Sequence, residues 1–386
     1  MRLVHQCSGK SGFTQIREMA ELAFGPGMVA PDEYYSYCLY DDDCFTPEAK
    51  RRFIGRRVQI ALNHLSNDPA WRAIADDKLI FTDAMRAHGF PTVPTVALRH
   101  DFRRPSAGHL LRDTRALQDF LREACYPLFA KPVAGIFSLG TARLEHFLPQ
   151  SDELVLAGLG PVPLDRFCQE AEFFAGRYEG YLFQPLLHPH PTIEAICGDR
   201  IASVRFVVLL DAKGPCILRT AWKIPTGSNI ADNFWRAGNL LASLDRETGR
   251  VLRVVCGTGP DQAHPECHPD TGYRLAGAAH PRWDEMRELC LAAAATLPGL
   301  RLQAWDVALC REGPLLQEVN IGGSYRLQQT ADGHGMLTTP FREFLDRRLP
   351  RWRSQTTRFI LQRFLTNRLH RIAGRGNRIG RASLPL

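Results

Sequence analysis

The chain lacks several features that mark whole classes of protein. Its eleven cysteines are odd in number, scattered, and never spaced as Cys-x-x-Cys, which favours reduced thiols over a disulfide framework. No apolar run approaches the length of a membrane span, the longest strand-like one being Val204 to Leu210. The start, from Met1 to Cys7, lacks the apolar stretch of a signal peptide. Together these absences predict a cytoplasmic protein.

Acidic residues are missing from the last forty positions. Residues 347–386 contain eleven arginines and no acid or lysine, a charge of +11, whereas the whole chain carries +7, so residues 1–346 carry −4. The basic character therefore belongs to the tail. No nucleic-acid partner is expected, because no aromatic stacking platform accompanies these arginines.

The tail also has a helical pattern. Between residues 355 and 373 one stripe contains Leu361, Phe364, Leu365, Leu369 and Ile372. Two partners fit a basic amphipathic helix of this kind. One is an anionic membrane surface bound through residues 347–386, at the inner face of the membrane. The other is the protein's own body.

Lysine is scarce, with six at positions 10, 50, 78, 131, 213 and 223. Because arginine supplies most positive charge here, a retained lysine indicates a need for a compact point charge. Lys78 opens a predicted helix that runs to about His88 and ends at Gly89. Lys131 ends an apolar strand and precedes small residues whose backbone amides can approach phosphate oxygens. A solvated surface position is the alternative for each lysine.

Two carboxylates are predicted to face each other across a hairpin. Residues 302–309 and 315–320 read as strands joined by the three-residue turn 311–313, with Gly313 where φ must be positive. This register puts Asp306 opposite Glu318, and Asn320 on the same face as Glu318. Like charges directly opposite destabilise a sheet. A bound cation would relieve that repulsion, and these oxygen ligands suit Mg²⁺. A solvated outer face is the alternative.

A zinc site is a second alternative, suggested by Cys256, His264, Glu266, Cys267 and His268. Their spacing matches no common structural zinc pattern. A loop in which His268 supports the turn at 269–272 is the competing interpretation.

The order of elements favours an α+β assembly. Residues 1–75 are predicted to be mostly helical, and residues 76–125 to form a helix, a proline-rich strand from Pro91 to Leu98 and another helix. Residues 126–185 alternate strands with a helix near 163–176. The rest up to about 340 is rich in strands, with one clear helix from Trp283 to Ala295. Strands and helices do not alternate strictly, unlike those of a doubly wound parallel sheet.

An ordered series of motifs resembles the ATP-grasp enzymes. The series is Asp-Asp-Lys-Leu at 76–79, Gly-Phe-Pro-Thr-Val-Pro at 89–94, Phe-Ala-Lys-Pro at 129–132, Phe-Gln-Pro at 183–185, Trp-Asp-Val at 305–307 and Glu-x-Asn at 318–320. The chain is most similar to the sugar-transfer-associated ATP-grasp branch, which is related to α-L-glutamate ligases. The segments that carry this narrower resemblance are 202–206, 232–239, 244–249, 268–272 and 281–285.

The resemblance implies an ATP-grasp fold, in which two α+β subdomains grip ATP. Its parts would be a helical N-terminal region at 1–75, a preceding segment at 76–125, a small subdomain with the phosphate loop at 126–185, a large subdomain with the metal site at 186–345, and a basic helical tail at 346–386.

The resemblance also implies a role for individual residues. Lys78 and Lys131 would hold the nucleotide phosphates. Gly135, Ser138 and Gly140 would belong to the loop that covers them. Residues 183–186, including Phe183, Gln184 and Leu186, would receive adenine, with Gln184 adding a side-chain contact. Asp306, Glu318 and Asn320 would bind Mg²⁺, which Mn²⁺ could replace. Arg205 and Arg219, on neighbouring strands, would stabilise the transferred phosphoryl group or the carboxylate being activated. The hairpin register leaves open whether both face the site.

The implied reaction is an ADP-forming ligation of a carboxylate to an amine through an acylphosphate. The substrates would be small molecules, and the family's association with glycan assembly suggests sugar-linked ones. Three departures leave the substrate open: a bulky phosphate loop, Ala304 where many of these ligases have arginine, and Gly322-Gly323 where a Pro-Gly pair is commoner. The alternative function is a nucleotide-binding scaffold or membrane-surface protein without turnover.

Overall fold

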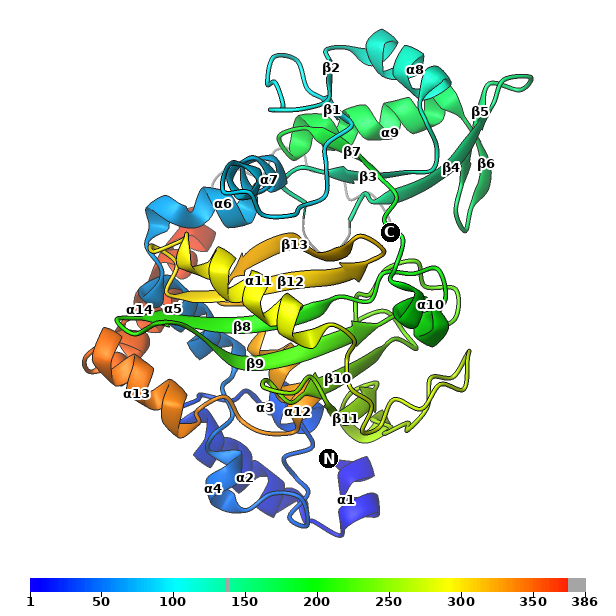
Figure 1. Cartoon of the computed structure of the whole chain (residues 1–386). Coiled ribbons are helices and arrows are strands. Elements are labelled where there is room, and N and C mark those ends of the chain that lie inside the picture. The colour runs from blue at the N-terminus through cyan, green and yellow to red at the C-terminus, as the bar shows by residue number, and fades with distance from the viewer. Residues whose placement is uncertain (136–138, 374–386) are drawn as a thin grey trace. The chain divides into compact units, whose positions relative to one another are not determined.

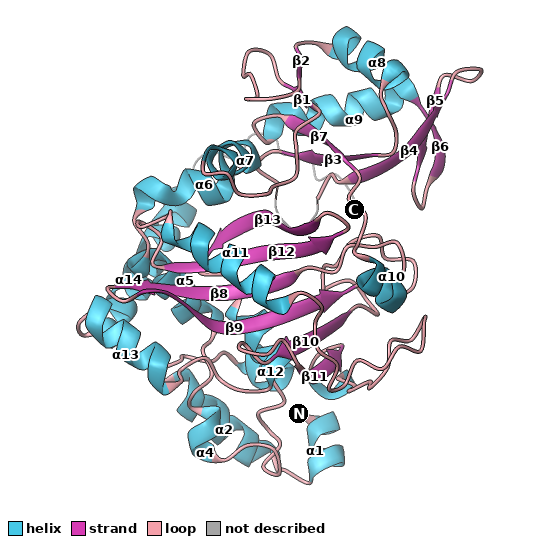
Figure 2. Ribbon diagram, in the orientation of Figure 1, coloured by secondary structure: helices cyan, strands magenta, loops and turns pink. Residues whose placement is uncertain are grey.

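The computed structural model describes residues 1–135 and 139–373, which fall into two compact units. The larger unit contains residues 36–38 and 67–333. The smaller unit is discontinuous in sequence, because it combines residues 1–35 and 39–66 with the segment that begins at His334. Figure 1 labels the helices and strands, and Figure 2 colours them by secondary structure. Both sheets belong to the larger unit, because every named strand lies between residues 97 and 321. None of the described helices combines the length and apolar character that a membrane-spanning segment needs.

One sheet of the larger unit has seven strands in the order β2-β1-β7-β3-β4-β5-β6. These strands are β1 (Ala97–Arg99), β2 (His109–Leu111), β3 (Leu128–Pro132), β4 (Ala142–Leu148), β5 (Glu153–Leu156), β6 (Gly160–Pro163) and β7 (Tyr181–Pro185). Helices α8 (Thr114–Glu123) and α9 (Leu164–Arg177) share its hydrophobic core, to which Leu117 and Leu121 of α8 and Phe167 of α9 contribute. The helical spacing of four residues between Leu117 and Leu121 explains why both are buried on one side of α8.

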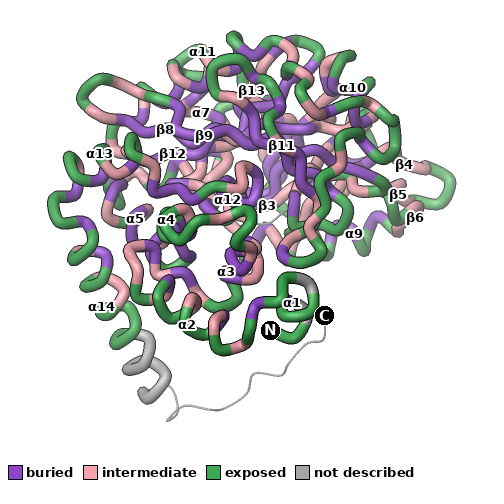
Figure 3. The backbone as a smooth tube through the Cα atoms, turned by 90° about the horizontal axis from the view of Figure 1, so that it is seen from below, coloured by how far each residue is buried: buried purple, intermediate pink, exposed green. Residues whose placement is uncertain are grey.

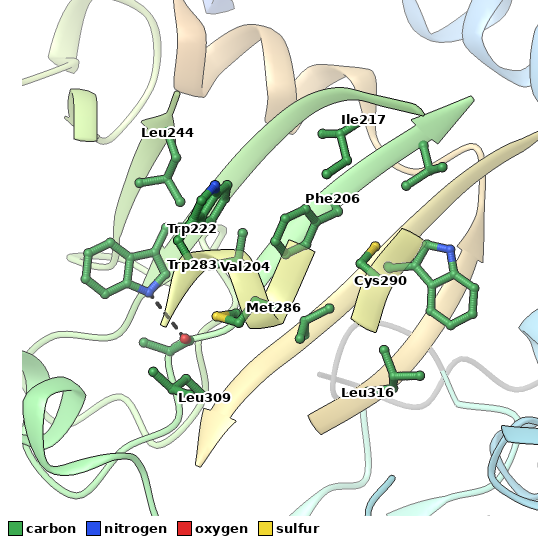
Figure 4. Close-up of a cluster of buried hydrophobic side chains, with 14 of the residues drawn as sticks. Val204, Phe206, Ile217, Trp222, Leu244, Trp283, Met286, Cys290, Leu309 and Leu316 are labelled. Carbon is green, nitrogen blue, oxygen red and sulfur yellow. Dashed lines mark hydrogen bonds between the residues drawn. The ribbon is translucent and has the colours of Figure 1, made fainter. Parts of the chain in front are cut away.

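The other sheet has six antiparallel strands in the order β11-β10-β9-β8-β12-β13. They are β8 (Val204–Asp211), β9 (Gly214–Ile224), β10 (Leu240–Leu244), β11 (Val251–Cys256), β12 (Leu302–Cys310) and β13 (Gly313–Ile321). Helix α11 (Trp283–Ala295) packs on this sheet, and Figure 4 shows its Trp283, Met286 and Cys290 beside strand residues such as Phe206. A separate cluster joins Leu327 and Ala331 of α12 (Tyr325–Asp332) to β9, β10 and β11.

The remaining short helices of the larger unit connect these layers. They are η1 (Pro69–Trp71), α6 (Arg72–Asp76), α7 (Lys78–Ala87), α10 (Pro191–Cys197) and η2 (Gly259–Asp261).

The smaller unit is helical. Its helices are α1 (Arg2–Ser8), α2 (Gly12–Ala23), α3 (Pro31–Ser36, whose last residue belongs to the larger unit), α4 (Pro47–Lys50), α5 (Arg56–Ser66), α13 (Thr339–Arg348) and α14 (Trp352–Ala373). An ionic cluster around two buried lysines ties its N-terminal segments together. The Lys10 ammonium lies 2.9 Å from Glu18 and 2.7 Å from Asp42, and the Lys50 ammonium lies 2.5 Å from Asp42.

The mixed layers confirm the predicted α+β class, and most predicted helices form. The helix predicted from Trp283 to Ala295 has those bounds, and α7 ends one residue before His88. The strand predicted from Pro91 to Leu98 is wrong over most of its length, because only β1 forms there. Pro91 and Pro94 have no amide proton for a sheet ladder, which accounts for the late start. Helices α10 and α12 were not foreseen in the strand-rich region.

His280 provides a test of how the larger unit responds to acid. Its ring lies 4.9 Å from that of Trp222, and burial lowers the pKa of His280 to about 4. In the unfolded chain histidine titrates near 6.5. Between these values the unfolded state binds a proton that the folded state does not, so stability falls as the pH falls. We expect titration of His280 to lower the free energy of unfolding by about 2 kcal/mol between pH 7 and pH 5.

The check is urea unfolding of the wild type and of His280→Gln at both pH values. The variant should lose less stability over this interval than the wild type. An equal loss in both proteins would show that His280 does not titrate in this way.

Candidate functional site

The hairpin pairs its two carboxylates as predicted. Asp306 of β12 is directly opposite Glu318 of β13. The Asn320 amide donates a hydrogen bond of 3.0 Å to Glu318 Oε1, so these two side chains share a face. The turn is shorter than predicted, because Cys310 already pairs with Gly313 and only residues 311–312 connect the strands. Gly313 does have a positive φ, of 131°.

Asp306 is held by two cations. The Arg205 guanidinium donates to both of its oxygens, at 2.7 Å from Nε and 2.5 Å from Nη2, and the Lys223 ammonium lies 3.0 Å from Oδ2. The carboxylate is only 3% exposed. Burial alone would raise the pKa of Asp306, but the charges of Arg205 and Lys223 outweigh it and hold that pKa well below its usual range. Asp306 is therefore an anion whose position is fixed from two neighbouring strands.

Lys223 is a site residue that the sequence analysis did not select. It lies on β9, is 7% exposed, and its ammonium is also 3.4 Å from Asp232. Asp232 in turn accepts a hydrogen bond of 2.9 Å from the Ser203 amide. One signal could have found Lys223: it is one of only six lysines and follows Ala221-Trp222 in an apolar strand.

The two arginines predicted to be catalytic have different surroundings. Arg205 binds Asp306 and lies 3.6 Å from Glu318. Arg219 instead forms an ion pair of 2.5 Å with Asp332, at the end of α12. Burial lowers the pKa of Arg219, and the charge of Asp332 opposes that shift. The structure therefore brings Arg205, and not Arg219, into contact with the carboxylate pair.

The two predicted phosphate lysines lie near the seven-stranded sheet. Lys78 begins α7, which Asp77 caps by accepting hydrogen bonds of 2.9 Å from the amides of Leu79 and Ile80. The Lys78 ammonium donates to the carbonyl oxygens of Gly135, at 2.7 Å, and Val133, at 3.3 Å. It thus anchors the first described part of the predicted phosphate loop.

Lys131 is half-buried on β3, with its ammonium 5.9 Å from the centre of the Phe129 ring. Burial, and then the positive charge of Lys78, lower the pKa of Lys131 to about 8. The negative charge of Glu318 acts in the opposite direction and favours a higher pKa for both lysines. The two lysines and Glu318 therefore lie within electrostatic reach of one another, although Lys78 belongs to α7, Lys131 to one sheet and Glu318 to the other.

The structure describes part of the predicted phosphate loop. Ser138 lies outside the described residues. Gly140 has a φ of 70°, and a Cβ there would lie 2.7 Å from the Phe174 ring of α9, so both backbone conformation and packing favour glycine. The Tyr181 hydroxyl donates to the Gly140 carbonyl at 2.8 Å, which fixes the far end of the loop.

The predicted adenine hinge lies at the end of β7. The Phe183 side chain is fully buried, and its carbonyl accepts a hydrogen bond of 2.9 Å from the Val96 amide. The Gln184 amide group is also buried and donates to the Val93 carbonyl at 3.3 Å. The Leu186 amide donates to the Pro127 carbonyl at 3.3 Å. Adenine binding at 183–186 stays a prediction.

The oxygen donors on the hairpin fit a hard divalent cation. Glu318 keeps a side chain that is 35% exposed, and Asn320 has an amide oxygen besides the nitrogen that donates to Glu318. Asp306 Oδ2 accepts from both Arg205 and Lys223, whereas Oδ1 accepts from Arg205 and keeps a second lone pair for a cation. The set therefore suits Mg²⁺, with Glu318 and Asn320 as the accessible ligands. We find no grouping of three or more His, Cys, Asp or Glu side chains able to hold a metal in the described part of the chain.

The zinc alternative gains no support from the histidines of its cluster. His264 Nδ1 lies 3.1 Å from the Val254 carbonyl, and His268 Nε2 lies 3.0 Å from that of Pro225. His268 is buried, and the Asp270 amide donates to its Nδ1 at 3.3 Å, as expected for support of the following turn.

Two of the sequence departures occur at one contact. Gly322 and Gly323 both have positive φ, and a Cβ on Gly323 would lie 2.5 Å from the Cβ of Ala304. The glycine turn therefore packs directly on Ala304, and a larger side chain at 304 would displace it. Arg205, on the adjacent strand β8, supplies Asp306 with a guanidinium, although position 304 lacks the arginine that many of these ligases have.

An aromatic residue lies on the loop that follows β9. Asn239 organises this loop, accepting 2.9 Å hydrogen bonds from the Thr226 amide and the Asn229 side chain. Trp235 of the loop is 40% exposed, and the Arg326 guanidinium lies 4.5 Å from the centre of its ring. Asp232 of the same loop contacts Lys223, which links the loop to the Asp306 cluster.

Comparison with known proteins gives a family match for part of the chain. Residues 173–342 match the family described as "Sugar-transfer associated ATP-grasp". The match includes all six strands of the antiparallel sheet and the Asp306–Glu318 pair. It confirms the resemblance predicted from the ordered motifs. No curated protein sequence matches the chain.

Solved structures show distant likenesses to the chain. D-alanine–D-alanine ligase from Helicobacter pylori is 13% identical with a TM-score of 0.43, over 77% of this chain and 70% of that one. Biotin carboxylase from Campylobacter jejuni is 10% identical with a TM-score of 0.42, over 72% and 52%. The biotin carboxylase domain of 2-oxoglutarate carboxylase from Hydrogenobacter thermophilus is 13% identical with a TM-score of 0.36, over 68% of this chain and less than half, 46%, of that one.

Protonation of Lys131 should control nucleotide affinity. Because its pKa is about 8, we expect ATP binding to weaken as the pH rises past 8, and binding above that pH to take up a proton. Lys131→Ala should weaken ATP binding by roughly 1–3 kcal/mol at pH 7, the range for a charge-assisted contact.

Titration calorimetry in buffers of different ionisation enthalpy measures both quantities. Lys131→Arg is the matched control, because arginine stays charged throughout this range and should remove the proton uptake. An affinity for ATP that does not change between pH 7 and 9.5 in the wild type would contradict the assignment.

Proposed function

We propose that this chain is an ATP-dependent carboxylate–amine ligase, because residues 173–342 match the sugar-transfer associated ATP-grasp family. A carboxylate oxygen of the first substrate attacks the γ-phosphorus of ATP, and ADP leaves. The amine of the second substrate then attacks the acyl carbon, the bond to phosphate breaks, and the amine loses a proton. The products are an amide, ADP and phosphate.

The observation that carries this proposal is the buried Asp306 anion, held by Arg205 and Lys223 and opposite the more exposed Glu318. A phosphoryl-transfer site needs fixed charge around the transferred group, because positioning and charge neutralisation supply most of the catalysis. Arg205 and Lys223 provide positive charge that cannot move, since Asp306 orients both. Lys78 of α7 and Lys131 of β3 provide further positive charge.

Asp306, Glu318 and Asn320 are the residues that would hold Mg²⁺. The ion would neutralise charge on the phosphates when bound. In this proposal Glu318 matters most, because it is the more accessible carboxylate and is within electrostatic reach of Lys78 and Lys131. Arg219 is left outside the reacting centre, as a residue that fixes the end of α12 through Asp332.

We assign the acceptor a sugar-linked chemistry, and place the reaction in glycan or amino-sugar modification in the cytoplasm. Trp235 supports this assignment, since the apolar face of a sugar ring packs well on an exposed aromatic ring. Arg326 above the same indole adds a donor for hydroxyl or carboxylate groups. The loop that carries Trp235 is joined to the Asp306 cluster through Asp232 and Lys223.

Glu318→Gln tests the ligase proposal against a scaffold that binds nucleotide without turnover. The substitution keeps the shape of the side chain but removes the negative charge. We expect ADP release, measured with panels of amino acids, amino sugars and peptides, to fall at least a hundredfold, while the melting temperature changes little. Mass spectrometry of the products identifies the acid and the amine.

Glu312→Gln, at the exposed tip of the same hairpin, is the matched control and should leave turnover unchanged. Full activity in Glu318→Gln would refute the site. ATP binding by the wild type with no turnover on any panel would favour the scaffold.

Trp235→Ala should raise the KM for a sugar-linked acceptor about tenfold and leave the KM for ATP unchanged. Trp235→Phe, which keeps an aromatic face, should restore much of the loss. Steady-state kinetics with each substrate varied in turn provides the measurement. An equal effect on both KM values would indicate a structural role for the indole.

A further inference from the structure

Helix α2 of the smaller unit exposes its apolar side. Phe13 is 78% exposed, Ile16 is 55% exposed, and Phe24, which caps the helix, is 92% exposed. Their spacing of three and eight residues places them on one side of the helix. A surface helix normally does the opposite and turns its polar side to water. Figure 3 shows where exposed residues lie along α2.

The inward side of α2 contains the apolar Leu22 but also polar residues, whose partners fix the rotation of the helix. Gln15 is fully buried, donates to the Lys10 carbonyl at 2.9 Å and accepts from the Tyr35 hydroxyl at 2.9 Å. Glu18 joins the buried cluster with Lys10 and Lys50. Turning the apolar side inward would break these bonds and leave buried charges without partners.

Helix α14 exposes a second apolar stripe in the same unit. Its first half docks on the body, because Trp352 and Thr356 are buried and the Phe359 ring lies 4.8 Å from that of His64 in α5. One turn later Leu361, Phe364 and Leu365 are 57%, 61% and 58% exposed. These three belong to the stripe predicted from the sequence, and the side chains of Leu369 and Ile372 lie outside the described residues.

The charge around this second stripe indicates what covers it. Arg358 and Arg363 are exposed beside it, and residues 347–386 carry eleven arginines without an acid. A second copy of the chain would bring the same positive charge to the same place, and the two tails would repel each other. An anionic bilayer surface offers the opposite charge together with an apolar layer that accepts Phe, Leu and Ile side chains.

We propose that the outward sides of α2 and α14 form a docking surface for an anionic lipid bilayer. The docking surface is defined by Phe13, Ile16, Phe24, Leu361, Phe364 and Leu365. The apolar side chains enter the headgroup region, and the arginines bind lipid phosphates. The protein lies on the membrane in this arrangement, and neither helix crosses it. The proposal does not rest on the ligase activity.

Co-sedimentation of the full chain with vesicles tests the proposal. The probes are vesicles of phosphatidylcholine alone and of phosphatidylcholine with 30% phosphatidylglycerol, at 50 and 500 mM salt. We expect binding to the acidic vesicles at low salt, at least tenfold weaker binding at high salt, and none to the neutral vesicles. Replacing Phe13, Ile16 and Phe24 by serine should weaken binding at least tenfold, and so should the same replacement of Leu361, Phe364 and Leu365.

The matched control replaces Phe102, Leu159 and Leu252 by serine. These residues are as exposed, at 60–79%, but belong to the larger unit, so binding should not change. Melting curves establish that each variant is folded. Binding that survives the α2 substitutions overturns the role of α2, and an absence of binding to acidic vesicles overturns the whole proposal. So does a self-association, measured by sedimentation equilibrium, that both sets of serine substitutions abolish.

Discussion

The buried carboxylate of Asp306 is the constraint on which the site depends. A carboxylate that is 3% exposed is stable only if its charge is neutralised. Two strands supply the cations for Asp306 of β12, because Arg205 comes from β8 and Lys223 from β9. The strands therefore cannot slip in register without leaving a charge unpaired. The same pairing explains why Arg205 and Lys223 can serve as fixed positive charges beside Glu318.

The six lysines show what can be inferred from amino-acid composition alone. Scarcity indicated that each retained lysine has a specific task, and in the structure only Lys213 is exposed. Lys10 and Lys50 share the ionic cluster of the smaller unit, Lys78 holds the backbone of a loop, and Lys223 faces Asp306. The sequence identified the residue type that matters but not which partner each lysine has.

The parts of the site that could be predicted are those set by neighbours in sequence. The start of α7 at Lys78 follows from the Asp77 cap. The Asp306–Glu318 pairing was predicted from a three-residue turn, whereas the strands are joined by two residues and a bulge between Asp306 and Val307 restores the predicted partners. The contact between Arg205 and Asp306 joins residues about a hundred positions apart, so no local pattern specifies it. The outward apolar side of α2 was missed for a related reason: a periodic pattern shows that a helix has two sides, but only the partners of Gln15 and Glu18 decide which side is buried.

The discontinuity of the smaller unit has a consequence for synthesis in the cell. Helix α5 ends at Ser66, and the α14 segment that packs on it begins at Trp352. At the usual pace of about 5–20 residues per second, a ribosome needs on the order of 15–60 s to make the sequence between them. Over that time the helices before Ser66 lack their last partner, and all strands of the larger unit are made in the same interval. The N-terminal helices of the smaller unit are therefore synthesised long before α14, the segment that completes their packing.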